Sequence, residues 1–60
     1  MNFRFWVGDG KVRWWEEYST EGTLWNPEYK KPTNEQEARE YGEMLMAKRG
    51  KRLLAVEVTE

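Results

Sequence analysis

The chain has 60 residues, of which ten are basic and eleven acidic, and it contains neither cysteine nor histidine. This length allows one domain, residues 1–60, and the missing residue types exclude disulfides, thiolate metal sites and the commonest general base. We therefore expect a non-enzymatic protein that binds no metal and no cofactor. The net charge of −1 argues against a nonspecific nucleic-acid binder, which usually carries a clear positive excess.

The stability of so short a chain has to come from bulky side chains, and the sequence supplies four Trp, three Tyr and two Phe. No apolar run is long enough for a membrane span or a signal peptide. Together with the initial Met1 and the absence of cysteine, this pattern favours a cytoplasmic protein that makes no membrane contact.

A β-hairpin is predicted at the start of the chain, where residues 2–7 and 12–18 are rich in the aromatic and β-branched side chains that favour strands. A two-residue type I′ turn at Asp9-Gly10 would join these strands and place Phe5 opposite Trp14. A turn one residue earlier would make two arginines face each other, which is unfavourable. We therefore prefer the first register.

A third, shorter strand is predicted over residues 23–26. A three-residue loop over 20–22, ending in a glycine, would lead into it. That loop places Trp25 on the same sheet face as Trp15, whereas a four-residue loop would exchange Leu24 and Trp25 between the faces. The sequence leaves both registers open.

A helix is predicted between Thr33, a good N-cap with Gln36 completing a capping box, and Gly50, which ends the helix. Gly42 in mid-helix costs about 1 kcal/mol relative to alanine. It therefore indicates a close approach to a bulky sheet side chain, for which Trp14 is the candidate. The apolar stripe predicted to face the sheet consists of Ala38, Tyr41, Gly42 and Leu45, flanked by Met44 and Met46.

The last strand is predicted over residues 52–59, with Leu54, Val56 and Val58 on one face. The order β-β-β-α-β along the chain defines an α+β fold, a small mixed sheet with one helix packed on one of its faces. The last strand returns through a crossover and lies parallel either to the first strand or to the third. The sequence does not decide between these positions.

The alternation of side chains along the strands divides the sheet into two faces. The first face matches the apolar stripe of the helix and is predicted to form the core. Its members are Phe3, Phe5, Val7, Val12, Trp14, Tyr18 and Leu24.

One helix cannot cover both faces of a sheet, so the second face is expected to be at least partly exposed. In the preferred register each arginine on it stacks on a Trp across the strand, a cation–π contact. Such a ladder stiffens a sheet, but Trp and Arg are also the residues most enriched at binding hot spots. The predicted binding residues are Arg4, Trp6, Arg13, Trp15 and Trp25.

Two charged features lie elsewhere in the sequence. An acidic row along the helix indicates either a solvated face or steering toward a basic partner. A basic run at the helix C-terminus complements the helix dipole and forms a candidate secondary patch for phosphate or acidic groups. The acidic row is Glu35, Glu37, Glu40 and Glu43, and the basic patch is Lys48, Arg49, Lys51 and Arg52.

Catalysis finds no support in the spacing of the carboxylates. Glu16 and Glu17 are adjacent in a predicted strand and therefore point to opposite faces, so they cannot form an acid–base pair. Ser19 has no histidine to activate it as a nucleophile.

Two resemblances bear on function. The strand and helix order, with Thr33 leading a Glu-rich helix and Gly50 before the closing strand, resembles small ββ(β)αβ proteins of bacteriophages. That resemblance implies binding to a host protein, since some of those proteins bind and inhibit host enzymes. The Arg- and Trp-rich sheet face is similar to that of the plant AP2-type DNA-binding domain and related integrase arms. This second resemblance implies contact between the sheet face and the DNA major groove.

Three classes of function follow from these patterns. The leading hypothesis is a protein-binding module, phage-like, that uses the Trp/Arg sheet face. The alternative is a nucleic-acid-binding domain that uses the same face together with the basic segment 48–52. The third is a structural domain that associates with itself as a homodimer.

Overall fold

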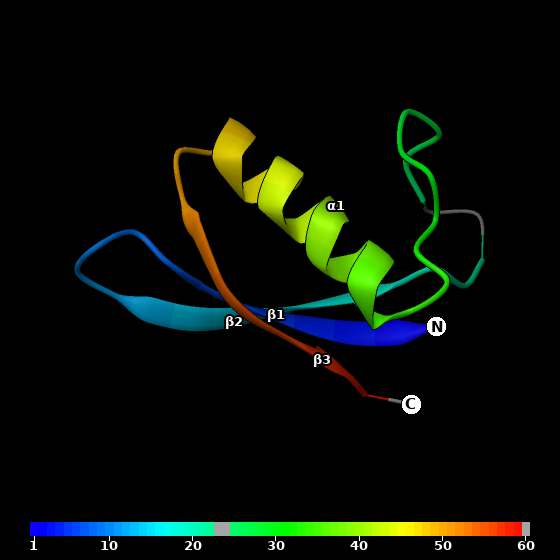
Figure 1. Cartoon of the computed structure of the whole chain (residues 1–60), viewed down its shortest axis with the longest axis horizontal. Helices are drawn as coiled ribbons and strands as arrows, with labels where there is room; N and C mark the ends of the chain where they lie inside the picture. The colour runs from blue at the N-terminus through cyan, green and yellow to red at the C-terminus, as the bar shows by residue number, and fades with distance from the viewer. Residues whose placement is uncertain (23–24, 60) are drawn as a thin grey trace.

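The computed structural model of the chain describes residues 1–22 and 25–59. It confirms the α+β fold, because within these residues three strands form one sheet and a single helix packs on one of its faces (Figure 1). Within the described residues the helix is too short and too polar to cross a membrane. In chain order the elements are β1 (Asn2–Gly8), β2 (Arg13–Ser19), α1 (Glu35–Lys48) and β3 (Arg52–Val58).

The strand order in the sheet is β2-β1-β3, with β1 in the centre and antiparallel to both neighbours. The sheet is thus antiparallel throughout, and the mixed sheet predicted from the sequence is wrong. The reason is the path of α1, which leads from the end of β2 back along the sheet to the hairpin (Figure 1). From there β3 runs in the direction of β2, and so opposite to β1.

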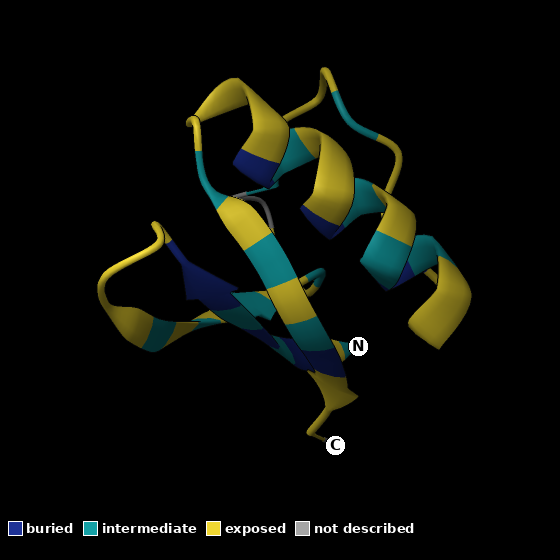
Figure 2. Ribbon diagram, turned by 60° about the vertical axis from the view of Figure 1, so that its left-hand side comes forward, coloured by how far each residue is buried: buried dark blue, intermediate teal, exposed yellow. Residues whose placement is uncertain are grey.

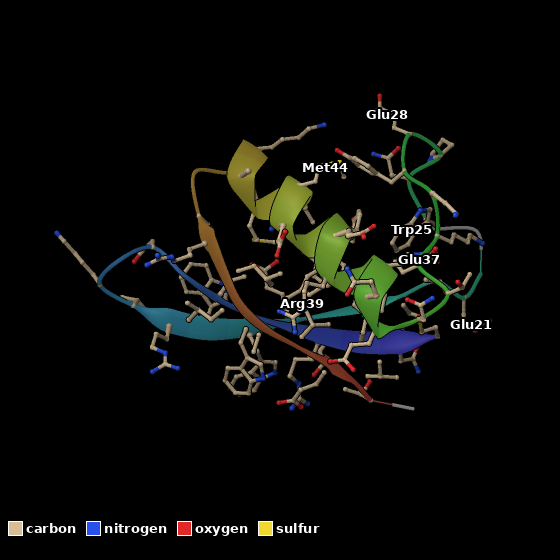
Figure 3. The ribbon with its side chains drawn as sticks, in the orientation of Figure 1. Glu21, Trp25, Glu28, Glu37, Arg39 and Met44 are labelled. Atoms are coloured by element: carbon tan, nitrogen blue, oxygen red, sulfur yellow. The ribbon has the colours of Figure 1, made fainter. Side chains whose placement is uncertain are left out.

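The region of the predicted third strand differs from the expectation. Residues 23 and 24 lie outside the described residues, and Trp25 and Asn26 lie in irregular backbone rather than in a strand. The indole N–H of Trp25 donates to the carbonyl oxygen of Tyr29 at 2.8 Å, and its ring centroid lies 4.9 Å from that of Tyr41. Figure 3 shows Trp25 beside the helix. Its predicted place on the second sheet face is therefore wrong.

The β1–β2 hairpin has a register two residues away from the predicted one, since Phe5 faces Glu16. The cause is a longer loop, in which the Asp9 carboxylate accepts hydrogen bonds at 3.0 Å from the backbone N–H groups of Lys11 and Val12. An even shift leaves every strand side chain on its predicted face. Val12, however, leaves the strand and is 57% exposed, so its assignment to the core is wrong.

The core lies between the sheet and α1, and it includes the buried Val56 of β3 (Figure 2). Phe3, Phe5 and Val7 are buried as predicted, whereas Trp14 and Tyr18 are half-buried. On the helix the centre of the buried stripe is shifted by one position from the predicted one. Tyr41 and Leu45, predicted to face the sheet, are half-buried and lie beside the stripe. The buried helix residues are Ala38, Gly42 and Met46, at the i, i+4 and i+8 positions of one face.

Gly42 makes the predicted close approach, but to a different side chain. A Cβ atom at this position would lie 2.9 Å from two ring carbons of Phe5 and 3.0 Å from Leu53. The candidate Trp14 is therefore wrong. Because β1 is the central strand, its side chains rather than those of β2 meet the middle of the helix.

The helix begins one residue later than predicted and ends as predicted. Asn34 rather than Thr33 is the N-cap, and its side chain accepts from the backbone N–H of Glu37 at 2.9 Å. Gly50 has a φ of 69°, and the N–H of Lys51 donates to the carbonyl of Met46 at 2.8 Å, which closes the last turn.

A β-bulge shapes the start of β3. Trp6 faces Ala55 whereas Val7 faces Leu53, so Leu54 is an extra residue between two paired positions. Leu53 therefore packs against the core, whereas Leu54, predicted on one face with the buried Val56, is 40% exposed.

Candidate binding surface on the open sheet face

The sheet face turned away from α1 is covered by no other element of the described residues (Figure 3). We call it the open face, and four of the five predicted binding residues lie on it. Its larger side chains are Arg4, Trp6, Arg13, Trp15, Glu17, Arg52, Leu54 and Glu57.

An aromatic pair lies at the centre of the open face. The Trp6 and Trp15 ring centroids are 5.3 Å apart with an interplanar angle of 49°. The guanidinium of Arg4 lies 5.5 Å from the Trp15 ring centroid, so the predicted stacking of these two residues is present, across a diagonal instead of a direct pair. Trp15 is nevertheless 53% exposed, and it is the one exposed aromatic side chain among residues 1–22 and 25–59.

Two carboxylates fix this centre, and neither was among the predicted binding residues. Glu17 accepts from Nε of Arg4 at 2.8 Å, and Glu57 accepts from the indole N–H of Trp6 at 2.7 Å. Glu57 also lies 3.8 Å from the Arg4 guanidinium. The charge of Arg4 is therefore compensated, and the Trp6 ring is held by its nitrogen.

The hairpin end of the open face is different, because its cations form no ion pair with a carboxylate of residues 1–22 and 25–59. A groove of about 340 Å³ lies there between the β1–β2 loop and the start of β3. We call it the hairpin groove. It is lined by Gly8, Gly10, Lys11, Val12, Arg13, Arg52 and Leu54.

Sequence reasoning assigned Arg13 to this face and missed its neighbours. Arg52 was placed in the basic patch, Val12 in the core, and Leu54 on one face of the last strand with Val56 and Val58. Val12 reaches the groove because the Asp9 carboxylate holds a wide loop, and hydrogen bonds from Val12 and Lys11 lower the pKa of Asp9. Leu54 reaches it through the bulge. Loop length and bulge position have no strong signal in the sequence.

The predicted basic patch does not form one surface. Lys48 donates to the hydroxyl of Tyr29 at 3.2 Å and lies over that ring, whereas Nζ of Lys51 lies 5.6 Å from the Trp14 ring centroid. Arg49 pairs with Glu16 at 2.8 Å. Three of the four predicted cations are thus engaged on the helix side of the sheet, and Arg52 alone joins the open face.

Glu16 is a hydrogen-bond centre on the helix side, and Glu17 lies on the open face, as predicted from their adjacency. The Glu16 carboxylate accepts from the indole N–H of Trp14 at 2.9 Å, the hydroxyl of Tyr18 at 2.7 Å and the guanidinium of Arg49 at 2.8 Å. Burial raises the pKa of Glu16, but these hydrogen bonds outweigh it, so the pKa lies below its ordinary value. Burial, and then the bond to Glu16, raise the pKa of Tyr18.

Glu16→Gln is expected to lower the free energy of unfolding by about 1–2 kcal/mol at neutral pH, because hydrogen bonds to a charged acceptor are lost. The pKa of folded Glu16 lies below the ordinary 4.5, so its contribution is complete above that value and is lost as the pH falls through the folded pKa. Urea melts from about pH 7 to about pH 3 should therefore give a flatter stability curve for the variant.

The matched control is Glu17→Gln, which removes the neighbouring charge on the exposed side and should cost less than about 1 kcal/mol. Asp9, Glu21 and Glu37 also have lowered pKa values and remain in both variants. Some loss of stability in acid is therefore expected in either variant. Equal acid slopes for Glu16→Gln and the wild type would show that the Glu16 carboxylate does not stabilise the fold.

No group of three or more Asp or Glu side chains in the described part of the chain could hold a metal ion. Comparisons with protein-family models, with curated proteins and with solved structures found no match.

Proposed function

We propose that this chain is a non-enzymatic protein-binding module whose open face contacts the partner. The observation that carries the proposal is Trp15, which is 53% exposed at the centre of a Trp/Arg cluster on a sheet face that no element covers. An exposed Trp in a pre-organised setting can bury a large apolar area at a low cost in side-chain entropy.

The pre-organisation comes from the contacts within the face. Trp6 is held by Glu57, and Arg4 is held by Glu17 while stacking on Trp15. These side chains therefore lose little conformational entropy when a partner binds. Such ordering costs are a main reason why the affinity of an interface is lower than its buried area suggests.

The choice of a protein over a nucleic acid rests on charge. Glu17 and Glu57 lie on the same face as the aromatic pair, and they would repel a phosphate backbone drawn across it. The predicted basic segment also adds only Arg52 to this face. Nucleic-acid binding remains the alternative proposal, carried by the cations of the hairpin groove.

Trp15→Ala is expected to weaken binding to the partner about 30-fold or more, as truncation of a hot-spot residue costs about 2 kcal/mol or more. The partner is isolated with the immobilised chain from lysate in two arms, with and without nuclease, and its affinity for each variant is then measured by calorimetry. The control is Met44→Ala, which removes an exposed apolar side chain from the helix and should change affinity less than about twofold.

The salt dependence separates the classes of partner. A protein contact dominated by Trp burial should respond weakly to salt, whereas phosphate contacts give a log–log slope of about −0.9 per phosphate. Binding that survives Trp15→Ala, or that disappears with nuclease, would contradict the proposal. A dimer of this chain that Trp15→Ala dissociates would assign the open face to self-association instead.

A further inference from the structure

One glycine lies on the floor of the hairpin groove. Gly8 pairs with Arg13 on one side and with Arg52 on the other, so two arginines flank a position without a side chain. The φ of Gly8 is not positive, and an added Cβ would lie 3.4 Å from both Leu54 and the backbone of Val12. The backbone therefore does not require glycine here, and the buried Gly8 lines the floor of the groove without a side chain.

The groove concentrates positive charge in a small area. Lys11, Arg13 and Arg52 line it, no carboxylate does, and none of the three has an ion pair within residues 1–22 and 25–59. The Asp9 carboxylate of the same loop is engaged by two backbone N–H groups. At the other end of the open face, by contrast, two glutamates compensate Arg4.

The walls of the groove restrict what can enter. Val12 and Leu54 are 57% and 40% exposed, so an occupant meets aliphatic surface beside the cations. Arg13 and Trp15 are two residues apart on one face of β2, which separates them by about 7 Å at the usual rise of a strand. An extended peptide with a carboxylate two residues from a large apolar side chain would therefore contact Arg13 and Trp15 at the same time.

We propose that the hairpin groove binds a carboxylate side chain from such an extended acidic segment of the protein partner. The proposal rests on the function proposed above and adds the chemistry of the partner. Arginine guanidinium groups recognise carboxylates through paired hydrogen bonds, and here Arg13 and Arg52 line the groove from the strands on either side of Gly8. A single carboxylate can pair with the cations of this groove. A phosphate chain that continued along the open face would meet Glu17 and Glu57, which would repel it.

The test uses the whole ¹⁵N-labelled chain and two short capped peptides, Gly-Ser-Glu-Val-Leu-Ser-Gly and its Gln counterpart, titrated in NMR spectra. The Glu peptide should shift the amide signals of Gly8 and Leu54 and the Nε–H signals of Arg13 and Arg52. The Gln peptide should bind about tenfold more weakly or worse.

Two variants test the groove itself. Gly8→Val fills the floor and keeps the charges, and Arg13→Ala with Arg52→Ala removes the charges. Each change should lower the affinity for the Glu peptide about tenfold. The control removes two cations from the helix side, with Lys30→Ala and Lys48→Ala, and should leave the affinity within about twofold.

Several results would overturn the proposal. These are equal binding of the two peptides, no shift at millimolar peptide, or full affinity in Gly8→Val. Tighter, saturable binding of a short DNA duplex at the same residues would replace it with a nucleic-acid site. Failure here is distinguishable from failure of the proposed function, because the Trp15→Ala comparison uses the captured partner and does not depend on either peptide.

Discussion

Phe5→Ala is expected to remove most of the stability of the fold. Phe5 is fully buried on the central strand, its ring centroid lies 4.8 Å from that of Tyr18 and 6.0 Å from that of Tyr41, and Gly42 packs directly on it. Truncation of a core Phe costs about 3–5 kcal/mol. A domain of 60 residues has a total stability of about 3–9 kcal/mol, so at the middle of these ranges the variant keeps only about 2 kcal/mol.

The matched control is Trp15→Ala, which deletes a larger ring from the same sheet but from its open face. It should lower the free energy of unfolding by less than about 1 kcal/mol, because the ring is half exposed before truncation. Trp14→Ala should fall between the two, since Trp14 is half-buried and not fully buried. Urea melts of the three variants measure the order. Equal losses for Phe5→Ala and Trp15→Ala would show that the face assignment is wrong.

The features that the sequence predicts best are those that tolerate an error of two residues. The assignment of Phe3, Phe5 and Val7 to one face and of Arg4 and Trp6 to the other depends only on alternation, and the register error left it intact. The end of the helix was predicted equally well, because a glycine with positive φ is a local signal.

The features that failed depend on contacts distant in sequence. The direction of β3 depends on the path of α1 across the sheet, and the place of Trp25 depends on its contact with Tyr41, sixteen positions further along the chain. The bulge at Leu54 has no glycine or other local marker. The hairpin groove combines a wide loop with this bulge, so the sequence pointed to the aromatic centre of the open face but not to the groove beside it.

Gly42 should show an inverted preference between glycine and alanine. In an exposed helix position alanine is favoured by about 1 kcal/mol, and Ala47→Gly, at an exposed position of α1, should cost that amount. At Gly42 a Cβ would lie 2.9 Å from the Phe5 ring, which is enclosed by the core and cannot move away freely. Gly42→Ala should therefore destabilise the fold, and Gly42→Leu should cost about 3 kcal/mol through overpacking.

Urea melts of these variants decide the sign, and a double variant identifies the cause. If the Phe5 ring is what the new side chain meets, Gly42→Ala should cost less in a Phe5→Leu background, because the aromatic ring carbons at the contact are gone. Glu43→Leu places the same large side chain on the exposed neighbour and should change stability by less than about 0.5 kcal/mol. A stabilising Gly42→Ala would mean that the helix does not approach β1 as closely as the packing described here requires.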